Sequence, residues 1–405
     1  MHVTSALRAQ LVHAHLERVF VPLRSVCAMA EADGGEGDAP QLLVLGGLGT
    51  VGRAFVKYCV EFELVGRVRV VDKTIPAMAY LSPAYKAVFE SPLVETIQAD
   101  LYQPAHVERA FAPSEACPGP FQLCVNLAAE TRYGRGEEIC QELVTKVREL
   151  CARKAVAAGV VKYVEVSTAQ VYEGKSKPAK ESSSTKPWTD IAKAHLAAEQ
   201  ALKTIAGLNY SVVRLPVVYG PADKAGLMPR IVCAATYQFT KNKMEFLWTP
   251  DLKVHTVHVQ DVAVALWTVL CAGEAGEVYN VVDEGDTDQG KINAILESIF
   301  RIETGFVGTV MSTMAKLKLE ELLDEANDGH LFPWERLKEA NKIYNTPLSP
   351  VLDKELLYDH NIALDGSKLA ALGFKCSCPR ITKDLVLDAI RYWMDMGLFP
   401  KVDLY

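Results

Sequence analysis

The chain has 405 residues, of which 49% are hydrophobic and 23% charged, and this composition excludes a mostly disordered or fibrous protein. Its 43 lysine and arginine residues against 50 acidic residues give a net charge of −7, so we expect no nucleic-acid partner. Because no apolar run reaches about 18 residues, we also expect no transmembrane segment.

The ten cysteines are scattered through apolar segments and form no Cys-x-x-Cys pair. A chain of this length does not need disulfide bonds, so we interpret the cysteines as reduced and structural. Cys376 and Cys378 are the closest pair, but they have no further ligands at zinc spacing. We therefore predict no metal site.

Residues 1–28 differ from the rest of the chain because they carry three arginines and only one acid, Glu17. Such a stretch resembles the presequence of a mitochondrial or plastid protein, although Met29 is an equally simple start of the protein. Residues 31–40 are acidic and Gly-rich, which is typical of a flexible link. We treat residues 1–40 as an N-terminal extension and expect a cytoplasmic protein, with a mitochondrial or plastid location as the alternative.

From Gln41 onward, short apolar runs alternate with segments of helical periodicity. We predict strands at 42–45, 68–72, 123–127, 163–166 and 210–215, and helices at 51–62, 137–158 and 191–205. Alternating strands and helices indicate an α/β fold, here a Rossmann-type doubly wound parallel sheet. We assign this dinucleotide-binding domain to residues 41–220.

After Pro216 the pattern changes, and proline and glycine interrupt the chain more often. We predict helices at 259–271, 312–327 and 381–396 and a strand at 276–282. Residues 221–405 are therefore expected to form a smaller C-terminal α/β lobe. Within it, residues 257–282 would complete the core and residues 304–360 would form a helical insert.

The sharpest motif is Gly46-Gly47-Leu48-Gly49-Thr50-Val51-Gly52, which follows a predicted strand and opens a predicted helix. Glycine at every third position allows a tight turn and a close approach of the backbone to a pyrophosphate. Asp72 follows twenty residues later, at the end of the next strand, where a carboxylate binds ribose hydroxyls. This acid favours NAD over NADP, although Lys73 and Arg53 leave NADP open.

Further motifs follow in order. They include Asp100-Leu101, Leu127-Ala128-Ala129, Val166-Ser167-Thr168-Ala169-Gln170-Val171-Tyr172, Arg214-Leu215-Pro216-Val217-Val218-Tyr219-Gly220-Pro221 and Val257-His258-Val259-Gln260-Asp261. Together with the glycine turn, they resemble the extended short-chain dehydrogenase/reductase superfamily, of the NAD-dependent epimerase/dehydratase type. This resemblance implies a nicotinamide dinucleotide bound by Gly46, Gly47, Gly49, Thr50, Val51, Gly52, Asp72, Lys73, Asp100, Leu101, Leu127, Ala128, Ala129, Thr131 and Pro216.

The resemblance also implies a catalytic Tyr and Lys four residues apart on one helix face, with a Ser or Thr from the neighbouring strand. When Pro187 and Glu199 are aligned with the family pattern, Ile191 occupies the Tyr position and His195 the Lys position. Thr168 keeps the Ser/Thr position. The Tyr-Lys pair is therefore absent.

Other residues offer weaker replacements for the missing pair. Thr189 and Lys193 are also four apart, but they fall on another side of the helix, and we expect Lys193 on the surface. The phenols of Tyr172 and Tyr219 stand at positions that usually serve packing. We expect Glu130 to be a solvated loop acid. His255 and His258 are predicted to point to opposite sides of their strand, which argues against a shared metal.

Three functions remain open. The preferred one is a cofactor-binding pseudoenzyme that acts as a regulatory or assembly subunit. The second is an active oxidoreductase or epimerase that uses Thr168 and His195 on a small carbonyl compound, alcohol or nucleotide sugar. The third is a scaffold that docks through Leu331-Phe332-Pro333-Trp334. Family analogy also suggests a homodimer through the helices at 137–158 and 191–205.

Overall fold

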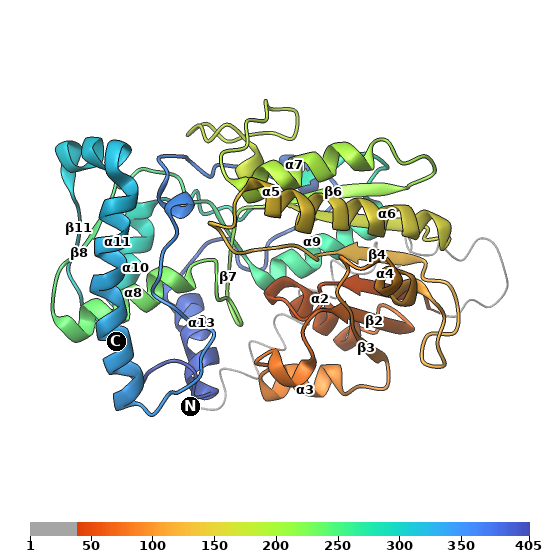
Figure 1. Ribbon diagram of the computed structural model, residues 1–405, viewed down its shortest axis with the longest axis horizontal. Helices are drawn as coiled ribbons and strands as arrows, with labels where there is room; N and C mark the ends of the chain where they lie inside the picture. The colour runs from red at the N-terminus through yellow and green to blue at the C-terminus, as the bar shows by residue number, and fades with distance from the viewer. Residues whose placement is uncertain (1–38) are drawn as a thin grey trace.

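The computed structural model describes residues 39–405, apart from the side chains of residues 309–311. The predicted targeting segment at 1–28 and all but the last two residues of the predicted N-terminal extension at 1–40 lie outside this range. A seven-stranded sheet has the order β10-β6-β5-β4-β1-β2-β3, and every pair in it is parallel (Figure 1). Its strands are β1 (Gln41–Leu45), β2 (Arg67–Asp72), β3 (Val94–Gln98), β4 (Leu123–Asn126), β5 (Lys162–Thr168), β6 (Tyr210–Leu215) and β10 (Val278–Asn280).

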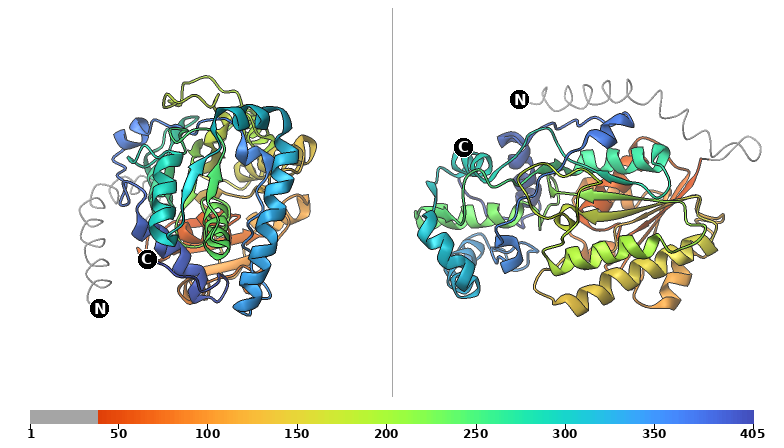
Figure 2. Two further views of the ribbon diagram at one scale, coloured as in Figure 1. Left: turned by 90° about the vertical axis from the view of Figure 1, so that its left-hand side faces the viewer. Right: turned by 90° about the horizontal axis from the view of Figure 1, so that it is seen from above.

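Helices cover both faces of this sheet, as the view from above in Figure 2 shows. Helices α2 (Thr50–Glu61) and α9 (Val259–Ala272) pack together on one face, while α4 (Pro104–Phe111), α6 (Val147–Ala157) and α7 (Asp190–Leu202) lie on the other. Strand β1 is buried on both sides. Its Leu42 and Val44 join the core under α2 and α9, and its Leu43 and Leu45 join the opposite core. The predicted doubly wound α/β fold is confirmed.

The C-terminal lobe stands beside the sheet, on the left in Figure 1. It contains α8 (Met228–Thr240), α10 (Gln289–Phe300), α11 (Gly308–Ala340) and α13 (Lys383–Asp395). Two small parallel sheets complete it, β8 (Met244–Phe246) with β11 (Thr304–Phe306) and β7 (Val217–Tyr219) with β9 (Thr256–His258).

The short elements of the whole chain are α3 (Pro83–Phe89), α5 (Glu137–Cys140), α12 (Ser367–Ala371) and the 3-10 turns η2 (Pro76–Met78), η4 (Ala169–Val171) and η5 (Lys354–Leu357).

Two predicted helices differ from the observed ones. The segment at 137–158 is divided, because the π-helical turns of η3 (Gln141–Lys146) separate α5 from α6. The helix predicted at 312–327 is part of the much longer α11, which is interrupted at Lys318 by a non-helical backbone conformation. Within α11, Trp334 is only 2% exposed and packs against Phe399, whereas Phe332 is 72% exposed. The proposed docking motif is therefore partly core.

A buried ion pair fixes α7 against the sheet. The carboxylate of Glu199 on α7 accepts hydrogen bonds from Arg214 Nε of β6 at 3.0 Å and from Ser167 Oγ of β5 at 2.6 Å. Both charged side chains are buried. Because a buried charge needs its partner, this pair determines which face of α7 is turned away from the sheet.

We predict that Arg214→Leu lowers the free energy of unfolding by about 3–5 kcal/mol, since it leaves the Glu199 carboxylate buried without its counter-charge. Urea denaturation measures this loss. The double variant Glu199→Leu/Arg214→Leu should recover a large part of it, because no charge then remains buried. Equal stability of Arg214→Leu and the wild type would contradict this role of the pair.

Candidate cofactor and substrate site

A cavity of about 830 Å³ begins at the carboxyl ends of the parallel strands and continues into the C-terminal lobe. In open α/β sheets, ligands bind at this edge, where the strand order reverses, which here is between β1 and β4. The cavity brings together Gly46, Gly49, Thr50, Val51, Gly52, Asp72, Lys73, Asp100, Leu101, Leu127, Ala128, Ala129, Thr131, Pro216, Thr168, Ile191 and His195. Of the residues that the sequence analysis proposed for the cofactor, it leaves out Gly47.

The glycine turn is as tight as its spacing predicts. Gly46 has a φ of +76°, and a Cβ there would lie 2.8 Å from the backbone nitrogen of Ala128. A Cβ at Gly52 would lie 2.5 Å from the Cα of Gly47. Gly47 itself serves packing, because its own Cβ would lie 2.7 Å from a methyl group of Val70. The turn thus brings the first N–H groups of α2 to the cavity, which is a favourable position for phosphate.

We predict that Gly52→Ala lowers both the melting temperature and the affinity for NAD, because the new methyl group forces the turn apart at a cost of about 1–3 kcal/mol. Gly329→Ala on α11 is the matched control, since a Cβ there meets no atom within 4 Å. Thermal unfolding and calorimetric titration with NAD measure the two effects. A Gly52→Ala protein that matches Gly329→Ala in both would contradict this account of the turn.

Asp72 is held by the turn that it faces. Its carboxylate accepts hydrogen bonds from the backbone N–H groups of Leu48 and Thr74, each at 3.0 Å. The guanidinium of Arg53 donates to the carbonyl oxygens of Leu48, Ala79 and Tyr80, so Arg53 is used within the fold. Arg53, Lys73 and, unexpected from the sequence, Lys224 are cations that line the cavity near this acid.

Helix α7 turns Ile191 and His195 toward the cavity. The alternative pair is elsewhere: the Lys193 ammonium contacts Glu137 at 2.7 Å and Asp190 at 3.1 Å outside the cavity. Thr189 is the N-cap of α7 and also donates its hydroxyl to Gln170 at 2.9 Å. The cavity face of the helix therefore carries an alkyl side chain and an imidazole.

His195 is 8% exposed, and its Nδ1 has no hydrogen-bond partner. Burial, with a further contribution from the positive charge of Arg148, lowers the pKa of His195 well below its usual value. The imidazole is therefore neutral at pH 7. Arg148 also lines the cavity; it is buried and forms an ion pair with Glu165 of β5. Arg148, in the helix predicted at 137–158, and Glu165, in the fifth predicted strand, were not among the site residues expected from the sequence.

The other candidate acids and bases have structural partners. The hydroxyl of Tyr172 donates to Asn280 at 2.8 Å and does not line the cavity. Tyr219 also lies outside the cavity walls and packs on His258. Glu130 lines the cavity, but its bonds to Arg132 lower its pKa to about 2. Among the tyrosines that do line the cavity is Tyr133, whose hydroxyl accepts a hydrogen bond from Gln170 at 2.8 Å.

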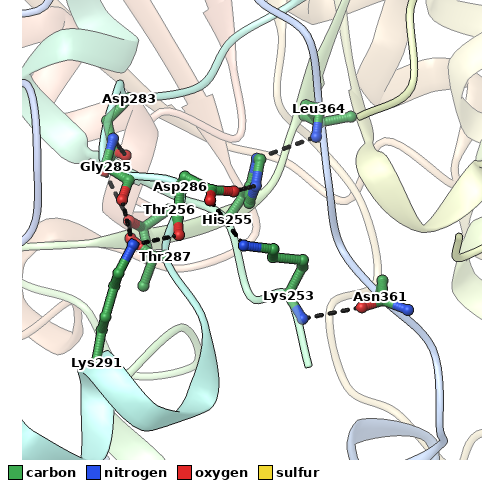
Figure 3. Close-up of polar contacts among 10 residues, drawn as sticks. All are labelled: Lys253, His255, Thr256, Asp283, Gly285, Asp286, Thr287, Lys291, Asn361 and Leu364. Carbon is green, nitrogen blue, oxygen red and sulfur yellow. Dashed lines mark hydrogen bonds and ion pairs between the residues drawn. The ribbon is translucent and has the colours of Figure 1, made fainter. Parts of the chain in front are cut away.

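The two histidines near β9 have separate structural roles. The His255 ring contacts Asp286 at 3.1 Å and accepts a hydrogen bond from the Leu364 backbone at 3.1 Å (Figure 3). The His258 ring caps the start of α9, where it accepts from Gln260 N at 3.4 Å. Within the described residues, no cluster of three or more His, Cys, Asp or Glu side chains is arranged to hold a metal ion.

The helical insert contacts the start of α7. Glu355 of η5 is buried and accepts a hydrogen bond from the backbone N–H of Asp190 at 2.7 Å. Nearby, the His360 ring stacks on Trp188 with 4.9 Å between centroids. The insert thus closes the cavity beside Ile191. No sequence motif indicated the contact between Asp190 and Glu355, because the two residues are more than 160 positions apart in the chain.

We predict a pH signature of the neutral His195. Between its lowered pKa and the unfolded value of about 6.5, only the unfolded chain binds this proton, so stability is lost as the pH falls below about 6.5. His195→Gln removes this loss. In urea denaturation at pH 7.5, 6 and 5, the stability of the wild type minus that of the variant should fall by up to about 1.4 kcal/mol per pH unit. A pH-independent difference would contradict a buried neutral imidazole.

A model of the NAD dependent epimerase/dehydratase family matches residues 42–282, which is more than half of the chain. The chain belongs to this family. No curated protein matches it in sequence. The structure of a double mutant of DesIV, a dTDP-glucose 4,6-dehydratase from Streptomyces venezuelae, solved with NAD and DAU, shares 20% identity and a TM-score of 0.63 over 87% of this chain and 97% of that one.

Two further structures of similar fold were solved with ligands. WbmG from Bordetella bronchiseptica, in complex with NAD, has 17% identity and a TM-score of 0.63 over 90% of this chain and 97% of that one. UDP-glucose 4-epimerase from Thermotoga maritima, with UDP-glucose, has 18% identity and a TM-score of 0.60 over 88% and 99%. At these identities the likeness establishes the fold. Among residues 39–405, no helix of this family member is long and apolar enough to span a membrane.

Proposed function

We propose that this member of the epimerase/dehydratase family binds NAD but has lost the Tyr-Lys acid–base chemistry, and that it acts as a regulatory or assembly subunit. The observation that carries the proposal is that Ile191 and His195, which the sequence comparison with the family pattern aligns with its Tyr and Lys, both line the cavity. DesIV and WbmG were both crystallised with NAD, which supports the choice of cofactor.

The chemistry of the two side chains supports a loss of turnover. An isoleucine has no proton to give, so no general acid stands at this position. The Lys of the family pattern carries a fixed charge that lowers the pKa of the Tyr, whereas His195 is neutral at pH 7. Its ring nitrogens can still bind the hydroxyl groups of a nicotinamide ribose. When bound, NAD would supply only a hydride acceptor to this site.

The acid at the end of β2 supports NAD over NADP. The Asp72 carboxylate is fixed by Leu48 and Thr74 and lines the cavity, so it would repel a 2′-phosphate and accept bonds from a ribose diol. Arg53 is occupied by backbone carbonyl groups and does not compensate, whereas Lys73 and Lys224 near this acid keep NADP as the alternative.

The second candidate is an active oxidoreductase or epimerase on a small carbonyl compound, alcohol or nucleotide sugar. The observation in its favour is the unpartnered Nδ1 of His195, in a cavity that Thr168 and Tyr133 also line. A neutral imidazole and two hydroxyl groups can hydrogen-bond a substrate oxygen. In this case the hydroxyl of Thr168 or Tyr133 would have to supply the proton.

We predict that calorimetric titration detects NAD binding with a clear preference over NADP. Asp72→Ala should weaken NAD binding about tenfold, which is about 1.4 kcal/mol, and reduce the preference. Asp324→Ala, at an exposed acid on α11, is the control and should change neither. Absence of binding to both nucleotides would contradict the proposal.

Turnover separates the two candidates. With a panel of carbonyl compounds, alcohols and nucleotide sugars, we expect no net oxidation of NADH or reduction of NAD by the wild type, and no epimerised sugar among the products. Turnover that Thr168→Val and His195→Ala abolish would establish the second candidate instead.

A further inference from the structure

We propose that the far part of the cavity binds an apolar molecule that carries a single anionic group, and not a nucleotide sugar. The distal half is defined here as the part lined by α8, β8, the loop that follows β8, α11 and residues 352–358. The inference rests on the proposed function in so far as it assigns a ligand class to the same cavity. The evidence for it is the composition of the walls of the distal half and not the NAD site.

The walls of the distal half are mainly hydrocarbon. They are formed by Met244, Phe246, Leu247, Trp248, Leu252, Val254, Val307, Leu319, Leu322, Leu323, Ala326, Leu352, Leu356 and Leu357. The polar atom of Trp248 is turned away from a ligand, because its Nε1 donates to the carbonyl oxygen of Leu357 at 2.9 Å. About half of this wall comes from the helical insert, so the insert itself makes the site apolar.

His330 and Gln289, two polar side chains at the walls of the distal half, already have partners within the protein. His330 contacts the hydroxyl of Tyr237 at 3.2 Å, and burial lowers the pKa of this histidine, which keeps it neutral. The Gln289 amide donates to the carbonyl oxygens of Leu247 and Thr249 at 3.1 and 3.2 Å.

The charged side chains of the same walls are paired as well. Lys253 forms an ion pair with Asp286 at 2.7 Å, shown in Figure 3. Glu245 lies 3.4 Å from Lys243. A nucleotide sugar would therefore bury its base, sugar hydroxyl groups and diphosphate among groups that have little to offer them, at the full cost of their desolvation.

Arg230 is the exception among the described charged side chains of the distal half. Its Nη1 is buried and has no hydrogen-bond partner, and its guanidinium lies 5.9 Å from the centre of the Phe246 ring. No carboxylate of the described residues forms an ion pair with it, and burial lowers its pKa only to about 10, so the charge persists at pH 7. Arg230 as a whole is half-buried, but its buried Nη1 lacks both a hydrogen bond and a counter-charge, and an anionic ligand would supply both.

The guanidinium fork matches a carboxylate, a sulfate or a phosphate equally well. The surrounding leucines and aromatic rings match an alkyl chain or a ring system. One anionic group on an apolar body is therefore the ligand chemistry that satisfies Arg230 and the walls together.

The test uses the full-length protein saturated with NAD and the fluorescent probe dansylaminoundecanoic acid. We expect the probe to bind with increased, blue-shifted emission. Dodecanoate and dodecyl phosphate should displace it, and their relative strength tells whether the head group is a carboxylate or a phosphate. Dodecanol should displace it about tenfold less well, and UDP-glucose should not displace it.

Two variants connect the binding to the structure. Arg230→Met should weaken dodecanoate binding about tenfold and leave dodecanol unchanged, so that acid and alcohol become equal. Leu322→Trp should fill the distal half and weaken both ligands, whereas Leu317→Trp, at an 83% exposed position on α11, is its matched control. Melting curves verify that each variant is folded.

Displacement of the probe by UDP-glucose, an unchanged acid-to-alcohol ratio in Arg230→Met, or absence of probe binding would each overturn the inference. Calorimetry with NAD is carried out on the same samples. A protein that binds NAD but not the probe contradicts this inference alone, and one that binds the probe but not NAD contradicts the proposed function alone.

Discussion

The ion pair between Glu199 and Arg214 is the interaction on which the orientation of α7, and therefore the wall of the cavity, depends. It anchors α7 to β5 and β6 and thereby fixes the rotation of the helix. With that rotation fixed, Ile191 and His195 face the cavity, and Lys193 faces the solvent side with its acidic partners. The family fold is thus retained around a helix that presents Ile191 and His195 to the cavity, and our proposal that the Tyr-Lys chemistry is lost rests on this face.

The cavity combines two different environments. Near the sheet, backbone N–H groups at the start of α2 and the Asp72 carboxylate form a polar surface suited to a dinucleotide. In the C-terminal lobe, the helical insert contributes leucines, and Arg230 contributes a charge whose buried Nη1 has no partner. Glu355 connects these two parts of the molecule, because from within the insert it accepts a hydrogen bond from the backbone at the start of α7. A ligand in the distal half would therefore lie next to the hydrogen bond between Glu355 of the insert and the start of α7.

Much of the fold follows from local sequence patterns. Apolar runs such as Leu42–Leu45 predicted buried parallel strands, and glycine spacing predicted the tight turn, because each depends on neighbouring residues. The π-helical break at η3 and the length of α11 could not be predicted, since tertiary packing decides them. The roles of Arg148, Glu355 and Arg230 also depend on partners or walls far away in sequence. The role of Gly47 could not be predicted either. Its place in the motif indicated a ligand contact, but in the fold it packs closely against Val70.

The central claim is that the chain holds NAD in a cavity without Tyr-Lys chemistry. Native mass spectrometry of the purified full-length protein, followed by denaturation and identification of released nucleotide, tests it most directly. The account predicts one NAD or NADH per chain, either carried through purification or taken up on addition, and a bound NAD that stays oxidised when the alcohols and nucleotide sugars of the turnover panel are added. A chain that carries no nucleotide and ignores both added NAD and added NADP would contradict the claim and leave only the fold in place.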